Sequence, residues 1–186
     1  MKNFAFLTDL SRRVASLRRD QRGVSAVEFA MLLPLMITLY LGAVEVSQGI
    51  AIQRKVTLTA RTVADLASQV TSINNADMTN LLNAASSVVA PFTASQLKVT
   101  VTAVNIDADG VAKVAWSDTR NGTTHGVDTV VALPAALKVP NSQVIWGEVN
   151  YNYVPAIGYV VTGPLNLFDQ IYMRPRLSGN IQRPNT

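Results

Sequence analysis

A long uncharged apolar segment near the N-terminus is the feature that most constrains this chain. Residues 29–44, FAMLLPLMITLYLGAV, carry no charge, and Glu28 and Glu45 are the only charged residues between positions 23 and 53. Together with its apolar flanks, the segment exceeds the roughly 20 residues that a helix needs to cross about 30 Å of hydrocarbon. The sequence therefore predicts one transmembrane helix.

The net charge of +4 comes entirely from the segment before this helix. Residues 1–23 contain six basic and two acidic side chains, whereas residues 24–186 contain ten of each. Basic residues that precede a membrane span stay on the cytoplasmic side. We therefore expect a basic leader peptide at 1–23, a single pass through a membrane, a cytoplasmic N-terminus and a C-terminal domain on the far side. Charge confined to a leader also predicts no nucleic-acid partner.

Glu28 is out of place at the start of an apolar span. A carboxylate in hydrocarbon costs about 2.5–3.5 kcal/mol on insertion scales, so Glu28 needs an interfacial position or a cationic partner. One interpretation is an interfacial acid that the helix dipole favours. Another is cleavage after Gly23, which would leave an ammonium on Val24, one helical turn before Glu28. That ammonium would pair with Glu28 of the same chain or of a neighbour.

The residues around this position resemble the class 3 signal of type IV pilins and pseudopilins. In that signal, prepilin peptidase cleaves after a glycine, and a glutamate occupies the fifth mature position. Gly23 and Glu28 match these two residues, and Phe29 matches the aromatic residue of the tight-adherence (Flp) branch. The sequence RGVSAVEFAMLLPL is similar to the opening of TadE-like pseudopilins of the Tad pilus system. Val24 departs from the phenylalanine that type IVa pilins usually have there.

This resemblance implies a function and a set of partners. The function would be that of a non-catalytic pseudopilin in Flp-type pilus assembly, secretion and surface adherence. Prepilin peptidase would process the chain, and the processing and assembly residues would be Gly23, Val24, Glu28 and Phe29. The other implied partners are pilins, Tad inner-membrane assembly proteins and membrane lipid. The implied location is the inner (cytoplasmic) membrane or the pilus, with the C-terminal domain periplasmic or extracellular.

Two helices are predicted from the apolar spacing. The first, over residues 24–72, joins the transmembrane segment to an amphipathic stalk, whose apolar face would pack against its own domain or another pilin's helix. The second lies within residues 73–92, with Asp77 as a cap and Pro91 as its stop. The apolar stalk positions are Val56, Ala60, Val63, Ala67 and Val70, and those of the second helix are Met78, Leu81, Leu82, Ala85, Val88 and Val89.

Beyond Pro91 the period changes to two, which predicts an antiparallel β-rich domain over residues 93–177 and an α+β fold class. A half-buried strand at 97–103 and the turn at 107–110 predict a β-hairpin with 111–116. Later strands are expected at 144–154 and 170–173, a polar surface loop at 118–126 and a loose tail at 178–186. Trp146, Tyr151 and Tyr153 are expected to be core residues. The strand sequences and the YMRPR ending also resemble TadE-like proteins.

Residues that could carry chemistry are few. The chain has no cysteine, which excludes disulfides, thiolate zinc sites and cysteine nucleophiles. His125 is the only histidine, and we expect it to be a solvated loop residue. The motif NIDADG at 105–110 matches half of a calcium loop, but Trp116 stands where the bidentate acid is required, which favours a tight turn. We therefore expect no catalytic residues, no cofactor, no metal and no enzymatic activity.

Two other functions remain compatible with the sequence. An uncleaved, single-pass membrane-anchored sensor or binding module would use its β-rich domain to hold a small ligand or a cell-wall component. A secreted enzyme would use an ordinary signal peptide cut near Ala43, although the residues around Ala43 make a poor cleavage site. The mature N-terminus separates the three: Val24 for the pseudopilin, Met1 for the anchored module and Val44 for the secreted enzyme.

Overall fold

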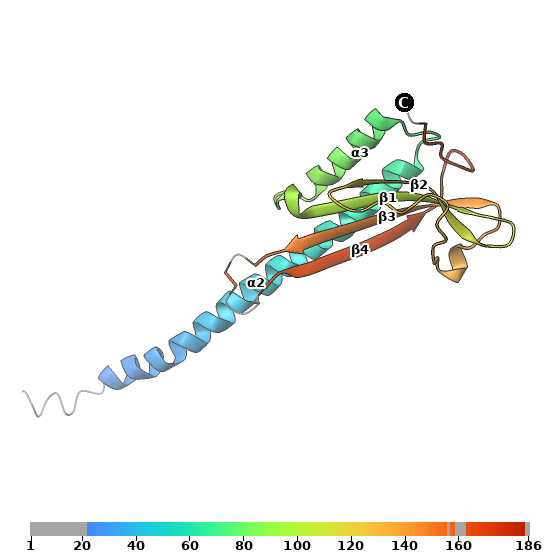
Figure 1. Ribbon diagram of the computed structural model, residues 1–186. Helices are drawn as coiled ribbons and strands as arrows, with labels where there is room; N and C mark the ends of the chain where they lie inside the picture. The colour runs from blue at the N-terminus through green and yellow to red at the C-terminus, as the bar shows by residue number, and fades with distance from the viewer. Residues whose placement is uncertain (1–21, 156, 159–162, 185–186) are drawn as a thin grey trace, which may run out of the picture. The chain divides into compact units, whose positions relative to one another are not determined.

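The computed structural model describes residues 22–155, 157–158 and 163–184, so most of the expected leader lies outside the described residues (Figure 1). The chain divides into two compact units, Met1–Val44 and Glu45–Thr186, whose boundary falls within helix α2. The predicted α+β class is confirmed. The elements are α2 (Arg22–Ser68), α3 (Asn75–Val88), the 3-10 turn η1 (Ala94–Gln96), β1 (Leu97–Ile106), β2 (Ala112–Arg120), the 3-10 turn η2 (Ala135–Leu137), β3 (Ser142–Tyr153) and β4 (Leu165–Met173).

In the second unit, α2 is amphipathic as predicted. Its buried apolar residues recur at helical spacing, because this face packs on the domain's own core. The helix ends at Ser68, whose carbonyl accepts a 2.9 Å hydrogen bond from the backbone N–H of Arg176. Val70 therefore lies beyond the helix and is exposed, unlike the expectation of a stalk to residue 72. The buried apolar positions are Ile52, Val56, Ala60, Val63 and Ala67.

Helix α3 is shorter than its predicted range. Its N-cap is Asn74, whose side chain accepts from the Asp77 backbone N–H at 2.9 Å, while the Asp77 carboxylate accepts from the Asn74 N–H. Asp77 is thus the reciprocal member of a capping box rather than the cap itself. At the other end, Lys55 Nζ donates to the Val88 carbonyl at 3.1 Å, which satisfies one of the free carbonyls there.

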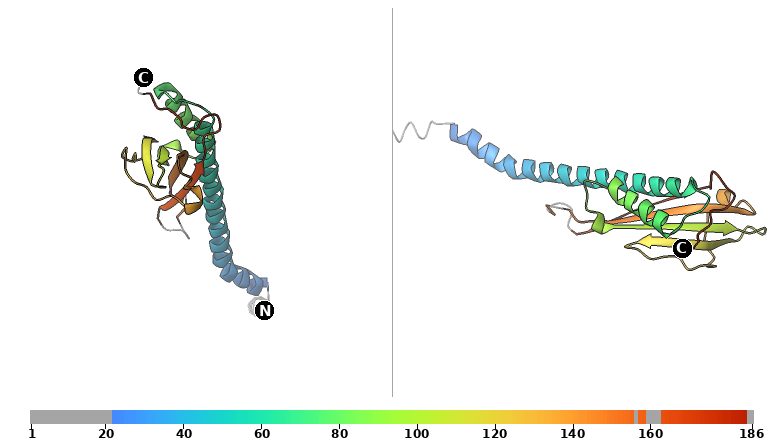
Figure 2. Two further views of the ribbon diagram at one scale, coloured as in Figure 1. Left: turned by 90° about the vertical axis from the view of Figure 1, so that its right-hand side faces the viewer. Right: turned by 90° about the horizontal axis from the view of Figure 1, so that it is seen from above.

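The four strands form one antiparallel sheet in the order β2-β1-β3-β4. The second half of α2 and α3 lie on the same face of this sheet (Figure 2). Val99 and Val149 pair across β1 and β3 and are buried on this face. Gly147 on β3 faces α2 at close range: a Cβ there would lie 3.1 Å from both the Ala60 carbonyl oxygen and the Ala64 Cβ. A side chain at this position would therefore be in unusually tight contact with α2, and the strand or the helix would have to shift by a few tenths of an ångström to admit it.

The predicted hairpin of β1 and β2 is confirmed, but β1 is buried on both faces rather than on one. The hydroxyl groups of Thr102 and Ser117 form a hydrogen bond of 2.8 Å, and those of Thr100 and Thr119 form one of 3.0 Å. The chain after β2 crosses this outer face, where Leu133 joins a second apolar cluster with Val104, Ile106, Ala112 and Val144. The expectation of a half-buried strand was wrong because the sequence does not show which connection covers the outer face.

Three element boundaries also differ from expectation. Strand β2 continues through Arg120, because residues up to Arg120 pair with β1, so the polar loop begins only at Asn121. Strand β3 begins at Ser142, two residues earlier than predicted. Strand β4 begins at Leu165 instead of residue 170, because it pairs with β3 along its whole length.

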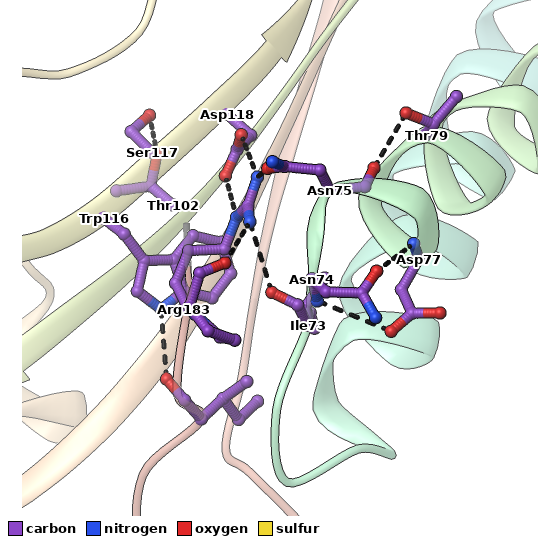
Figure 3. A network of polar contacts seen from close by, with 12 residues as sticks. Ile73, Asn74, Asn75, Asp77, Thr79, Thr102, Trp116, Ser117, Asp118 and Arg183 are labelled. Atoms are coloured by element: carbon purple, nitrogen blue, oxygen red, sulfur yellow. Dashed lines mark hydrogen bonds and ion pairs between the residues drawn. The ribbon is translucent and has the colours of Figure 1, made fainter. Parts of the chain in front are cut away.

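The C-terminal segment is packed against the domain instead of being loose. Ile181 is buried, and its carbonyl accepts a 3.1 Å hydrogen bond from Trp116 Nε1. Gln182 pairs with Ser72 in a parallel bridge. Arg183 extends toward Asp118 on β2 and the start of α3 (Figure 3). These contacts correct the expectation of a loose tail for the described residues 178–184.

Candidate processing and assembly site

All four residues of the expected processing site lie in the first turns of α2. Gly23 is the second residue of this helix, and a Cβ built on it would meet no atom within 4 Å. Val24 and Phe29 are exposed, and so is Glu28. Glycine has a low helix propensity, so Gly23 stabilises this turn less than another residue would.

The helical geometry places Val24 and Glu28 one turn apart on the same side of α2. Within the described residues, α2 runs from Arg22, and its first turn contains no acidic residue. If the chain began at Val24, the ammonium of Val24 would be the nearest cation one turn before the carboxylate.

The apolar segment after this site is exposed around the whole helix. Thirteen large apolar side chains between Val24 and Ile50 are exposed in the described structure. One helix of the described chain is long and apolar enough to cross a membrane, and it covers Gly23–Ser68. A helix that is apolar on all sides needs lipid or other helices around it, because water is an unfavourable surrounding for such a surface. The first unit therefore has the properties of a membrane anchor.

These features define a chain with one candidate membrane span followed by an α+β domain. The family model described as TadE-like protein matches residues 23–65, which include the whole apolar segment and the expected processing site. The expected resemblance to TadE-like proteins is thus confirmed over this segment. No curated protein and no solved structure matches the chain.

A cluster that the sequence analysis missed lies on the outer face of the sheet, opposite α2. His125 Nε2 lies 2.6 Å from Glu148 Oε2, and its ring stacks on Trp146 with a centroid distance of 4.6 Å. Trp146 in turn stacks on Tyr172 at 5.8 Å. The expectation that His125 is a solvated loop residue was therefore wrong. Trp146 is half-buried here, while Tyr151 and Tyr153 are core residues on the other face, as expected.

The turn between β1 and β2 is held by backbone hydrogen bonds to the carboxylate of Asp107. Asp107 Oδ1 accepts from the backbone N–H groups of Asp109 at 3.0 Å and Val111 at 2.8 Å. Gly110 has a φ of 78°, which explains the glycine at this position. Turn geometry therefore accounts for the NIDADG motif. Within the described ranges, no group of three or more acidic, histidine or cysteine side chains is placed to hold a metal ion.

One end of the second unit contains a cavity of about 370 Å³, whose lining includes Gln48, Phe92, Tyr151 and Tyr153. Tyr153 Oη donates to Gln48 Oε1 at 3.3 Å. Burial raises the pKa of Tyr153, and the nearby carboxylate of Glu45 raises this pKa further. Burial also raises the pKa of Tyr151. Both phenols are therefore neutral hydrogen-bonding groups at ordinary pH.

Proposed function

We propose that this chain is a non-catalytic pseudopilin of the tight-adherence type, cleaved by prepilin peptidase between Gly23 and Val24. It would act in Flp-type pilus assembly, in secretion and in surface adherence. Its partners would be other pilins, inner-membrane assembly proteins and the lipid of the inner membrane. The α+β domain would lie on the periplasmic or extracellular side.

This proposal rests on three features that occur together in helix α2. The candidate processing residues occupy the first turns of α2, an all-round apolar segment follows, and the family match covers both. An ordinary soluble domain would bury such a segment, and a simple anchor would not need an acid at the start of it. Cleavage would give Glu28 a role, because it would create a cation one helical turn before the acid.

The assembly mechanism follows from the same geometry. In the bilayer, the exposed apolar side chains of α2 contact lipid. In an assembled complex they contact the helices of neighbouring subunits, so the loss of lipid contact is offset by helix burial. A Glu28 that pairs with the Val24 ammonium of a neighbour sets the axial position of the two helices, because only one register brings these charges together.

N-terminal sequencing of the membrane-extracted protein tests this proposal. The expected mature N-terminus is Val24, and it should depend on Gly23 and on prepilin peptidase. Recovery of Met1 as the dominant N-terminus would overturn the processing step and favour an uncleaved anchor. Recovery of Val44 would instead indicate an ordinary signal peptide and a secreted protein.

A second candidate function is the uncleaved, membrane-anchored binding module. The observation in its favour is a second cavity of about 370 Å³, whose lining includes the polar side chains of Asn105, Gln143 and Arg183. This candidate predicts an intact Met1 N-terminus and no loss of function on substitution of Gly23.

A further inference from the structure

An apolar groove lies between the last part of α2 and α3, which are neighbours in the second unit (Figure 2). The groove has a volume of about 280 Å³, and its charged lining residue is Asp77. Its apolar lining residues include Leu66, Val70, Ile73, Leu81 and Ala84. Leu66 is 38% exposed and Val70 is 36% exposed, so apolar side chains of the groove are open to solvent. Grouped exposure of this kind marks a contact with a partner.

The walls of the groove indicate the shape of its occupant. Asp77, Leu81 and Ala84 share one face of α3, because they follow one another at helical spacing. The opposite wall includes Leu66, which belongs to the last turn of α2. The side-chain ridge of a third helix packs into a groove between two helices, and it binds there through a few apolar anchors. The occupant is therefore a helix with an exposed apolar side chain.

The second unit itself presents such a ridge on α2. Leu58 is 50% exposed, whereas Val56 and Ala60 on the other side of the helix are buried in the core. Arg54 and Arg61 lie one turn before and one turn after Leu58, and both are exposed. Within the described part of the chain, neither arginine side chain has an acidic partner. We call Arg54, Leu58 and Arg61 the α2 ridge.

The charge of the groove is opposite to that of the α2 ridge. Asp77 is exposed, and one of its carboxylate oxygens accepts from the Asn74 backbone N–H at 3.4 Å. The other oxygen has no hydrogen-bond donor among the described residues, so the carboxylate can accept from an arginine of a partner. The ridge therefore offers what the groove requires, which is one apolar anchor with a cation close to it.

The exposed apolar residues of the helices favour the same occupant. In the second unit, the exposed large apolar residues that belong to a described helix are all on α2, and none is on α3. Leu66 already lines the groove, which leaves Val46, Ile50 and Leu58 as possible anchors. Of these three, Leu58 has a cation one turn away on both sides. Leu58 is thus the anchor that the charge of the groove selects.

We propose that the groove between α2 and α3 of one copy binds the α2 ridge of a second copy of this chain. Leu58 enters the groove, and an arginine beside it pairs with Asp77. The groove and the ridge are different surfaces of one domain, so each copy uses its groove with one neighbour and its ridge with another. Such a heterologous contact repeats along a ring or a filament and does not close as a two-fold dimer.

This inference rests on the proposed function, because it names the contact through which the domains of an assembling pseudopilin meet. Its test uses the full chain in the native host, expressed as two copies that carry different tags. One copy carries Thr62→Cys, one turn after Leu58 on α2, and the other carries Asn80→Cys in the groove. The chain has no cysteine of its own, so a short bismaleimide can join only these positions within the two copies.

We expect a crosslink between the two tagged copies. A chain that carries both cysteines should give a ladder of oligomers, because each copy then has a reactive ridge and a reactive groove. Adding Leu58→Glu to the Thr62→Cys copy should lower the yield severalfold, whereas the matched control Val130→Glu, also at an exposed valine of the second unit, should not. Adding Arg54→Glu with Arg61→Glu should also lower the yield severalfold, and Lys138→Glu is the control for charge.

Three results would overturn the inference. One is the absence of a crosslink between the two tagged copies. Another is a crosslink that forms mainly between two Thr62→Cys copies or two Asn80→Cys copies, since that contact would be two-fold. A third is a crosslink from Asn80→Cys to a different protein, because the occupant of the groove would then not be this chain.

Mass spectrometry of the N-terminus in the same samples separates this inference from the proposed function. A Val24 N-terminus without the crosslink would remove the inference and leave the processing step intact. A Met1 N-terminus together with the crosslink would overturn the proposed processing, while the contact between groove and ridge would stand.

Discussion

The guanidinium of Arg183 forms a two-point ion pair with the carboxylate of Asp118, with N–O distances of 2.8 and 2.9 Å. The same guanidinium donates to Asn75 Oδ1 at 2.8 Å, so one side chain links the C-terminal segment, strand β2 and the start of α3. The pair also raises the pKa of Arg183, chiefly through the hydrogen bonds to Asp118. Charge-assisted, two-point pairs of this kind are the stronger class of hydrogen bond.

Replacement of Arg183 should therefore destabilise the second unit. We expect Arg183→Met to lower the free energy of unfolding by roughly 1–3 kcal/mol, because Asp118 then loses its charged partner while mostly buried. Arg183→Lys should recover only part of this loss, since an ammonium cannot make the two-point contact. Urea unfolding followed by tryptophan fluorescence measures the effect, and a change within about 0.5 kcal/mol for Arg183→Met would contradict it.

The contacts of this segment show why its structure was not predictable from the sequence. The residues near Arg183 show no helical or strand periodicity, and its partner Asp118 lies 65 positions away. By contrast, α2 and the strands could be predicted from local repeats of apolar residues, because the repeat depends only on the geometry of each segment. Local periodicity was thus enough to predict the fold class. The packing of the C-terminal segment could not be predicted, because it depends on contacts between residues far apart in the sequence.

The aromatic cluster of the outer face illustrates the same limit. Trp146 and Glu148 are two residues apart on β3 and share its outer face, so the expectation that Trp146 joins Tyr151 and Tyr153 in the core was wrong. The approach of His125 depends on the path of the connection between β2 and β3, which no periodic pattern encodes. The expected processing residues all lie within one short motif, so they can be proposed from the sequence alone and stay a prediction.

A second prediction concerns the close approach of β3 to α2 at Gly147. A Cβ at this position would lie 3.1 Å from the carbonyl oxygen of Ala60, which is backbone and cannot move alone. We expect Gly147→Ala to destabilise the domain by about 1–3 kcal/mol and Gly147→Val by more, because overpacking forces the strand and helix apart. The matched control is Gly179→Ala, where a Cβ meets nothing within 4 Å.

Thermal or urea unfolding of these variants measures the effect. The control should lie close to wild type, because it gains a methyl group in open space. Equal stabilities of the Gly147→Val and Gly179→Ala variants would show that β3 does not lie against α2 as closely as described.

A third prediction concerns alkaline pH. Burial raises the pKa of Tyr151, Tyr153 and Tyr172 in the folded protein, and Glu148 adds to the effect at Tyr172. In the unfolded chain the tyrosine pKa values are about 10, so the unfolded chain loses these phenolic protons at lower pH than the folded protein does. The stabilising contribution is therefore complete below about pH 10 and is lost as pH rises through the folded-state values.

The free energy of unfolding should accordingly fall above about pH 10, and the fall should be smaller in Tyr153→Phe. The slope against pH is the relevant readout, since Tyr153→Phe also removes the hydrogen bond to Gln48 at every pH. Identical slopes in the wild type and in the three single phenylalanine variants would show that these phenols do not have raised pKa values.

The last prediction concerns Glu28 and assembly. A Glu28→Ala subunit should insert and be cleaved normally, because the apolar segment and Gly23 are unchanged. It should enter pilus complexes about tenfold less well, since losing an interhelical polar contact worth about 1–2 kcal/mol changes an equilibrium by that factor. Glu28→Gln should also assemble poorly, because it keeps hydrogen bonding but lacks the charge that attracts the Val24 ammonium. Pull-down of the pilus complex with quantification of the tagged subunit measures incorporation.

Thr38→Ala is the matched control for this experiment. Thr38 is a polar residue of the same apolar segment, and its hydroxyl donates to the Pro34 carbonyl at 2.9 Å. Its hydrogen bond is satisfied within its own helix, so its removal should leave incorporation unchanged. If Glu28→Ala were incorporated as well as Thr38→Ala, the pairing of Glu28 with a neighbour's amine would be wrong. Failure of Glu28→Ala to be cleaved would instead assign this residue to recognition by the peptidase, because assembly would then be blocked one step earlier.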